Sequence, residues 1–363
     1  MKNVNAAVKK KTKAKNDKFN DKEEVAKVSF FATIKFKLIA SFMVPIMFII
    51  LLGIISYIKA SEVIESNYEK ASEDKINMAG ECMKYGFKSV QASATLYAND
   101  SLIKRYSISQ DDKVQSFVYK DALGNILWSR MAVDEFIKSI YLINKNVDSL
   151  STGEGIDNGI FDSFKETDLG KFLDNKKTEH IWDGEDAFLD KQLRTSADDY
   201  SMRLIKNVSN FDTFLIFDVK ADVVKNILSE LKFDKAGFLG LVTPDGKEII
   251  DDSLKQEDSS IDMEALKSEK IFVNEAFYKE AMEGKEVSGS KYVDYKGATY
   301  LFLYSKVSDT GAALCALMPK STITGQADSI KNTTIIIVII ACALTIILVK
   351  ILSSGIDKKL RTS

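Results

Sequence analysis

Two stretches of this sequence decide its fold, YSMRLIKNVSNFDTFLIFDVKADVV at residues 200–224 and YLFLYSKVSDTGAALCALMPKSTI at residues 300–323. Each begins with a tyrosine and a strand of alternating pattern, and each places a lysine six residues after that tyrosine. Each then crosses a polar turn and continues through a second apolar strand into a helix start that contains lysine. This shared order predicts one antiparallel-sheet module that occurs twice.

A hairpin pattern precedes each of these stretches, SIYLINKNVDSL at 139–150 and FLGLVTPDGKEII at 238–250. In the second hairpin, Pro244–Gly246 is a turn signal, because proline presets one backbone dihedral angle and glycine tolerates a positive one. The order of hairpin, middle section and two long adjacent strands is therefore written twice. We expect an α+β fold with two antiparallel-sheet modules, a membrane-distal module over 111–232 and a membrane-proximal module over 233–320.

The segment before the first module is helical, because its apolar residues recur at three- and four-residue steps between residues 61 and 106. We expect a stalk helix over 59–110 and a second helix over 112–133. A stalk of that length needs a partner along its apolar stripe, which is either its own sheets or the same helix of a second subunit. Residues 151–199 are irregular and rich in glycine and aspartate, and long sections of that kind are usually functional.

Two uncharged runs bracket the modules. The first covers Leu38–Ile58, and the second begins at Thr333 and reaches Leu352 if Lys350 extends to the membrane interface. Because about 20 helical residues cross a bilayer core of about 30 Å, we expect transmembrane helices over 38–58 and 333–352, the second within a helix over 321–352. The alternative is a pair of buried helices in a large soluble core. A cleaved signal peptide is not favoured, because the first run is long and no small-residue cleavage site follows it.

Basic residues are concentrated outside the two apolar runs. Eleven lysines and four acidic residues precede the first run, whereas acidic residues outnumber basic ones between the runs. Because basic flanks stay in the cytoplasm, we expect a plasma-membrane protein with both termini cytoplasmic, a basic tail over 1–37, and residues 59–332 outside. The lysines could instead bind nucleic acid, but they lack interleaved aromatic residues and the chain has a net charge of −2, so we expect no nucleic-acid partner.

Composition excludes several kinds of site. The chain of 363 residues is 45% hydrophobic, which is enough for packed cores, but it contains one histidine and three cysteines. Those counts exclude most zinc sites, most histidine-dependent triads and a disulfide scaffold. We find no glycine-rich phosphate loop or nucleophile elbow, so we expect no cofactor and no enzyme activity. Cys82 and Cys315 could bridge, or they could remain two separate buried thiols.

The order of elements, together with the segment YSKVSDTGAALCALMPKSTI at 304–323, resembles the double Cache sensor regions of bacterial methyl-accepting chemotaxis proteins and sensor kinases. The modules of that family are PAS-like, so the resemblance implies two PAS-like modules after a stalk helix. It also implies a homodimer formed through the stalk and transmembrane helices. The tail SSGIDKKLRTS at 353–363 is similar to the start of a HAMP relay helix, except that Lys358 and Lys359 stand where a proline would follow the isoleucine.

The resemblance implies a chemoreceptor that senses an extracellular small molecule and passes a conformational signal across the membrane for chemotaxis. The alternatives are the input region of a histidine kinase or diguanylate cyclase, a membrane-tethered hydrolase that uses paired carboxylates such as Asp198 and Asp199, or an adhesive surface protein. The chain ends before any signalling domain, so we expect a truncated receptor or an output supplied by another protein. The family's amino-acid pattern, arginine two positions before tryptophan, is missing at both tryptophans, so the motif does not support an amino-acid ligand, and another small molecule such as an organic acid or an amine stays open.

Six residues are candidates for a ligand pocket under the 151–199 section of the first module. A pocket for a polar solute combines an aromatic wall with a few convergent polar groups. In this interpretation Trp182 supplies a stacking face, Arg194 or Arg203 pairs with a carboxylate, and an aspartate holds an ammonium group. The alternatives are ordinary packing for the aromatic residues, solvated surface for the charges, and for the aspartate a cap on the helix beginning near Ala221. The six candidates are Tyr141, Trp182, Arg194, Tyr200, Arg203 and Asp218.

Three further features are weaker candidates. His180 could sense pH, although a lone histidine at a strand edge is more often packed or solvated. The acidic segment 183–190 could hold calcium, although it lacks the regular alternation of acids in a calcium loop and is more typical of a solvated loop. Asn207 begins a formal glycosylation acceptor, but it overlaps the repeated strand pattern.

Overall fold

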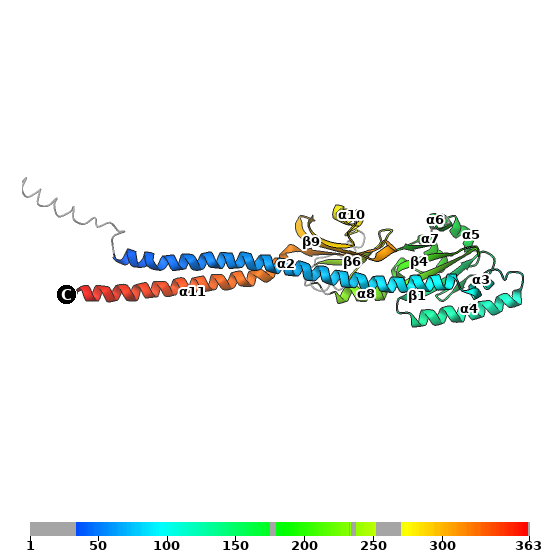
Figure 1. Cartoon of the computed structure of the whole chain (residues 1–363), viewed down its shortest axis with the longest axis horizontal. Helices are drawn as coiled ribbons and strands as arrows, with labels where there is room; N and C mark the ends of the chain where they lie inside the picture. Colours follow the sequence, from blue (N-terminus) through cyan, green and yellow to red (C-terminus); the bar gives the residue numbers. More distant parts are fainter. Residues whose placement is uncertain (1–33, 175–178, 232, 234–236, 252–269, 362–363) are drawn as a thin grey trace, which may run out of the picture. The chain divides into compact units, whose positions relative to one another are not determined.

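The computed structural model describes residues 34–174, 179–231, 233, 237–251 and 270–361 (Figure 1). Most of the expected basic tail, up to residue 33, lies outside the described residues. The chain divides into two compact units, one over 65–323 and the other made of the flanking segments up to 64 and from 324. The larger unit contains both sheets.

Two helices are long and apolar enough to cross a membrane. α2 (Ile34–Ala98) contains the first apolar run, and α11 (Lys320–Arg361) contains the second. The two helices meet where Gly53 lies against the methyl group of Thr334, which a Cβ at position 53 would overlap. A glycine at that point allows the two helix backbones to approach closely. The other apolar side chains along both runs are largely exposed, as lipid-facing side chains are.

Each half of the 65–323 unit contains a five-stranded antiparallel sheet, and the two sheets have the same strand order. The first sheet has the order β2 (Leu150–Ser151), β1 (Ile137–Asn144), β5 (Thr213–Lys220), β4 (Tyr200–Val208) and β3 (His180–Asp183). The second has the order β7 (Glu248–Ile250), β6 (Phe238–Val242), β10 (Ala313–Pro319), β9 (Ala298–Lys306) and β8 (Ser288–Tyr295).

The equivalent places of the strands confirm the repeat that the sequence predicts. The two stretches that decide the fold form the central pairs β4/β5 and β9/β10, and the two hairpins form β1/β2 and β6/β7. The turn of the second hairpin holds Gly246 at a φ of 87°, a left-handed conformation that glycine adopts without strain. The fold is therefore α+β, with a first module built on β1–β5 and a second module built on β6–β10.

Short helices fill the remaining segments. The helical stretch before the first sheet is interrupted after Ala98, because the Asp100 carboxylate accepts a hydrogen bond from the Leu102 backbone N at 2.6 Å and caps a new helix. The expected stalk is thus one long helix followed by a short one. The helices are α3 (Ser101–Ser107), α4 (Lys113–Val133), α5 (Ile160–Lys165), α6 (Asp168–Asp174), α7 (Ala187–Leu193), α8 (Ala221–Glu230) and α10 (Ala276–Glu283), with 3-10 turns η3 (Ala197–Asp199) and η5 (Ser308–Thr310).

One face of each sheet packs against α2 (Figure 1). Two glycines of α2 allow the close approach, since a Cβ at Gly80 would overlap the hydroxyl of Ser305 on β9 and one at Gly86 would overlap the ring of Phe136. Of the two partners considered for the stalk, its own sheets therefore cover this stripe. The fully buried residues of α2 are Ile76, Met83, Phe87, Val90 and Ala94.

The two cysteines outside the apolar runs are free. Cys82 is exposed on α2, and Cys315 is buried in β10. The structure thus supports separate thiols rather than a bridge, although only Cys315 is buried. Burial raises the pKa of the Cys315 thiol, so this side chain behaves as a small apolar residue of the core.

Candidate functional site

A row of polar side chains crosses the first sheet on the face turned away from α2. The antiparallel register pairs Asp183 on β3 with Arg203 on β4, and Arg203 with Asp218 on β5. It also pairs Asp218 with Ser139 on β1. Directly paired residues point to the same face of a sheet, so the register alone gathers these four side chains.

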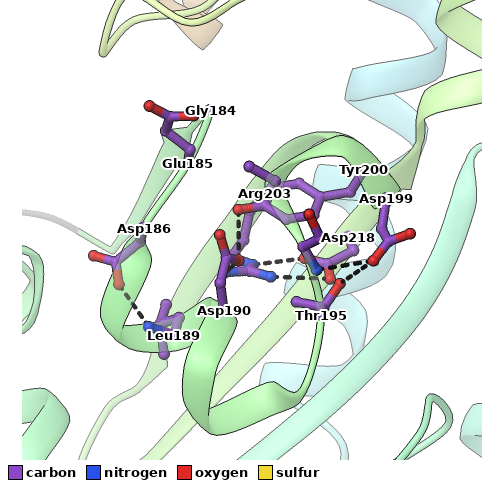
Figure 2. Close-up of polar contacts among 12 residues, drawn as sticks. Gly184, Glu185, Asp186, Leu189, Asp190, Thr195, Asp199, Tyr200, Arg203 and Asp218 are labelled. Atoms are coloured by element: carbon purple, nitrogen blue, oxygen red, sulfur yellow. Dashed lines mark hydrogen bonds and ion pairs between the residues drawn. The ribbon is translucent and has the colours of Figure 1, made fainter.

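The centre of the row is Arg203, whose side chain is completely buried. Its Nε donates to Asp218 Oδ1 at 2.6 Å, and its Nη2 donates to Asp218 Oδ2 at 3.1 Å (Figure 2). Its Nη1 donates to Asp190 Oδ1 at 3.0 Å. The guanidinium thus forms a two-pronged pair with one carboxylate and a single hydrogen bond with another, which compensates for the removal of its charge from water.

Asp190 reaches the row from α7. The N-cap residue of this helix is Asp186, whose carboxylate accepts from the Leu189 backbone N at 2.7 Å. The Tyr200 hydroxyl donates to the same Asp190 Oδ1 at 2.9 Å, and the guanidinium carbon of Arg203 lies 4.2 Å from the centre of the Tyr200 ring (Figure 2). Tyr200, Asp190, Arg203 and Asp218 therefore form one connected group, which we call the polar network.

The surroundings shift the pKa values of the network in ways that keep the arginine charged. Burial alone would lower the pKa of Arg203, but the charge and hydrogen bonds of Asp218 raise it above its ordinary value. Burial raises the pKa of Tyr200, and it raises the pKa of Tyr141 to about 12 with help from the nearby Asp218 charge. Burial also raises the pKa of Asp190, against the opposite effect of Arg203.

Four of the six predicted site residues lie on this one face: Tyr141, Tyr200, Arg203 and Asp218. Asp218 does not cap the following helix, because the N-cap residue of α8 is Lys220 and no side chain caps the helix. The arginine meets carboxylates of its own chain rather than an open space, since Asp218 and Asp190 already neutralise it.

The other two predicted residues lie elsewhere. Trp182 points to the opposite face of β3 and packs against Phe87 of α2, with the ring centres 5.3 Å apart. Arg194 ends α7 in a left-handed conformation, and its exposed side chain forms an ion pair with Asp157 at 2.8 Å. The structure thus gives Trp182 a packing role against the stalk and gives Arg194 a surface position.

Apolar side chains fill the rest of this face beneath α5–α7. The rings of Phe161 and Phe164 pack on Phe214 of β5, with centres 5.2 and 4.9 Å apart. Leu189 and Leu193 of α7 are completely buried beside them. The irregular 151–199 section is therefore a packed cover of short helices around the edge strand β3.

A cleft of about 270 Å³ lies next to the polar network, where the two modules meet, and Tyr200 borders both. Within the part of the chain that the structure describes, four charged side chains of the cleft wall have no ion-pair partner: Glu185, Asp198, Lys225 and Lys270. Lys247 also borders the cleft, but its ammonium group donates to backbone carbonyls, among them Tyr200 O at 2.9 Å. The cleft thus offers charges of both signs to a small polar molecule.

The acidic segment 183–190 has structural roles rather than the arrangement of a calcium loop. Asp186 caps α7, and Asp190 binds Arg203. Among the residues that the structure describes, no group of three or more acidic, histidine or cysteine side chains is placed to hold a metal ion. The sequence did not predict Asp190 as a member of the polar network. Nothing in the residues around it indicates that Arg203, thirteen positions later in the chain, is its partner.

The remaining weak candidates have ordinary surroundings. Burial, and then the charge of Lys206, lower the pKa of His180 and so disfavour its charged form. The Asn207 side chain donates to the Leu173 carbonyl at 3.2 Å. Asp199 accepts from the backbone N of Ser196 at 2.8 Å in a capping box, so its carboxylate closes a turn, whereas Asp198 lines the cleft.

Comparisons with known proteins place the chain beside solved sensor domains at low identity. No family model matches the chain, and no curated protein matches it in sequence. The ligand-binding domain of Mlp24 with asparagine is 15% identical, with 73% of this chain and 99% of that chain covered and a TM-score of 0.46. The ligand-binding domain of the Campylobacter jejuni chemoreceptor Tlp3 with L-norvaline is 16% identical, with 72% and 94% covered and a TM-score of 0.46.

The extracellular domain of vpHK1S-Z8, which is described as a histidine kinase, is 14% identical, with 73% of this chain and 96% of that chain covered and a TM-score of 0.49. These solved structures are sensor domains of chemoreceptors and of a protein described as a histidine kinase. The fold itself rests on the strand order and register of this chain.

Proposed function

We propose that this chain is the sensory region of a two-span plasma-membrane receptor, with both termini in the cytoplasm and residues 59–332 outside. One observation carries the proposal. In the sequence, the 65–323 unit with its two like sheets lies between two helices that are apolar enough to cross a bilayer. The concentration of lysines before the first helix supports this orientation. In this proposal the chain has no catalytic role.

The ligand in this proposal is a small organic acid or amine that enters the cleft between the modules. Lys225 and Lys270 supply positive charge for a carboxylate, and Glu185 and Asp198 supply negative charge for an amine. Tyr200 borders the cleft with little exposed surface, and the same residue contacts the polar network. A ligand in the cleft therefore touches residues of both modules, so it can favour one arrangement of the modules over another.

The signal leaves through the second module. Its central strand β10 ends at Pro319, and α11 begins at the next residue, so a displacement of the strand has a short covalent path to the second apolar helix. Helix shifts of about 1–2 Å are usual in such transitions, and coupling energies of about 1–3 kcal/mol are typical. The output is chemotaxis in our preferred version, and a kinase or cyclase in the alternative.

A homodimer through the stalk is part of the proposal. Exposed apolar side chains remain on the surface of α2 and α4 that the sheets do not cover. A second copy of the same surface would bury them, which fits a receptor that signals through paired helices. These exposed side chains are Met78, Tyr85, Leu96, Phe117, Trp128 and Val133.

A thermal-shift screen of the full chain in lipid nanodiscs against organic acids and amines tests the function. A ligand that binds the folded state at one hundred times its Kd stabilises it by about 2.7 kcal/mol. The Lys225→Gln and Lys270→Gln variants should lose the response to acids, whereas Lys285→Gln, an exposed lysine outside the cleft, should keep it. No stabilisation by any compound, or an unchanged response in both cleft variants, would reject the cleft as the ligand site.

A further inference from the structure

The turn between β6 and β7 reaches from the second module to the first. Its Asp245 accepts hydrogen bonds through Oδ1 from the Gly184 backbone N at 2.7 Å and through Oδ2 from the Glu185 backbone N at 3.2 Å. Thr243 of the same turn donates to Asp245 Oδ1 at 2.7 Å and fixes the carboxylate. Gly184 allows this approach, because a Cβ there would overlap both Thr243 and Asp245.

The same turn holds the first module a second time through Lys247. Its ammonium group donates to Gly184 O at 3.1 Å, to Tyr200 O at 2.9 Å and to the Ala197 carbonyl. It also lies 4.6 Å from the centre of the Tyr200 ring. We call these contacts of Asp245 and Lys247 the inter-module clamp. The clamp joins the second module to Gly184 and Glu185, which follow the end of β3 at Asp183. It also joins the second module to Tyr200, whose hydroxyl binds Asp190.

Asp183 immediately precedes Gly184 and Glu185, the two residues whose amides the clamp holds. Among the described residues, its carboxyl group forms no ion pair. It is 7% exposed, and its Oδ2 has no hydrogen-bond partner in the part of the chain described. Its neighbour across the register, Arg203, is already bound by Asp218 and Asp190. A buried carboxylate without a partner is strongly disfavoured in its charged form.

Four charged groups around Asp183, from three different segments, act on its carboxyl. Three are acidic: Asp245 from the β6–β7 turn, Asp186 from the start of α7 and Asp190 from α7 itself. Arg203 from β4 is the one that favours the carboxylate. Burial, followed by the charges of Asp245 and Asp186, raises the pKa of Asp183 to about 7.

We propose that Asp183 is a proton-operated switch of the inter-module clamp. When the Asp183 carboxyl is neutral, the clamp is closed. When it loses its proton, a carboxylate whose Oδ2 has no hydrogen-bond donor among the described residues gains a charge that the Asp245 carboxylate repels. This repulsion and the need for hydration favour separation of the turn from Gly184 and Glu185. The switch changes the relation between the modules and does not require a ligand, so it goes beyond the proposed function and can be tested apart from it.

The direction of the pH effect follows from the raised pKa. The folded state holds the Asp183 proton more tightly than the unfolded chain does, so this group stabilises the closed, folded state fully below about pH 4. The stabilisation decreases as the pH rises and is lost on passing the folded-state pKa of about 7. The closed clamp is therefore favoured in mildly acidic surroundings and the open clamp in mildly alkaline ones.

Two measurements on the full chain in nanodiscs test the proposal. Hydrogen exchange of the Gly184 and Glu185 amides, corrected for the intrinsic pH dependence of exchange, reports whether the clamp is closed. Infrared pH-difference spectra report the protonated carboxyl group. We expect protection of the two amides to fall by about tenfold or more between about pH 5.5 and pH 8.5, together with loss of a carboxyl band.

Three variants decide the outcome. Asp183→Asn, which imitates the neutral carboxyl, should keep the amides protected throughout and lack the band. Asp245→Asn keeps one acceptor but removes the opposing charge, so the midpoint should move to lower pH. Asp111→Asn, an exposed acid, should behave as the wild type. A wild-type protection that does not change with pH, a full transition in Asp183→Asn, or an unmoved midpoint in Asp245→Asn would each overturn the proposal. Asp245→Asn keeps the test decisive if Asp183→Asn does not fold.

Discussion

The two modules share one strand order but fill the face turned away from α2 with different chemistry. In the first module, β4 and β5 pair Arg203 with Asp218, whereas in the second module β9 and β10 pair Phe302 with Leu317. Both pairs are fully buried. Because an apolar pair supports the same sheet, the fold does not require the ion pair, and buried ion pairs seldom stabilise more than apolar residues of similar size. The polar network is therefore a difference between the modules that the shared fold does not require.

The repeated lysine shows the opposite case, a feature that both modules use in the same way. Lys206 on β4 forms an ion pair with Glu179 at 3.2 Å, beside the edge strand β3. Lys306 on β9 donates to the carbonyl oxygens of Met282 at 3.2 Å and Gly284 at 2.5 Å, just before the edge strand β8. In each module the lysine ties the strand to the segment that leads into its edge strand, which is a structural role.

Breaking the ion pair of the first module is expected to have the largest effect. Asp218→Ala leaves the Arg203 guanidinium buried with one carboxylate instead of two, which should destabilise the protein by about 3–5 kcal/mol. Urea unfolding of the solubilised full chain measures the loss. The double variant Arg203→Met, Asp218→Leu imitates the apolar pair of the second module and should recover most of it. A double variant as unstable as Asp218→Ala would show that the modules do not tolerate the same chemistry.

A matched truncation in the second module should cost somewhat less. Leu317→Ala removes a completely buried side chain that packs beside Phe302 on the equivalent strand, and the cavity should destabilise the protein by about 2–4 kcal/mol. Unlike Asp218→Ala, it leaves no unpaired charge, so the loss should not vary between about pH 5 and pH 8. A pH-dependent loss in Leu317→Ala would contradict this separation of packing from electrostatics.

The smallest effect is expected at Arg194. The sequence makes Arg194 and Arg203 equal candidates for binding a ligand carboxylate, and their different surroundings predict different contributions to stability. Arg194→Ala removes one partner of an exposed ion pair with Asp157, so the free energy of unfolding should change by less than about 1 kcal/mol. Added salt should reduce even that change. A loss comparable with that of Asp218→Ala would show that the exposed pair supports the cover of the first sheet.

The architecture follows from period and repetition, which are properties that a sequence displays directly. Alternation in residues 200–208 and 300–306 indicates strands, and the second copy of the pattern doubles the evidence. The candidate site was only partly accessible in this way. The sequence predicts Arg203 and Asp218 as site residues, but their pairing depends on the register of β4 with β5, and Asp190 joins them from a separate short helix.

By itself, the sequence determined two apolar runs, a helical stalk and two like modules, because each depends on spacing along the chain. Only the tertiary structure decided that Trp182 faces the stalk while its neighbour Asp183 faces the polar network, because the position of β3 in the sheet sets which side each residue takes. Only the tertiary structure brought Asp245 and Lys247 to the first module, because hydrogen bonds between residues about 60 positions apart leave no periodic trace in the chain.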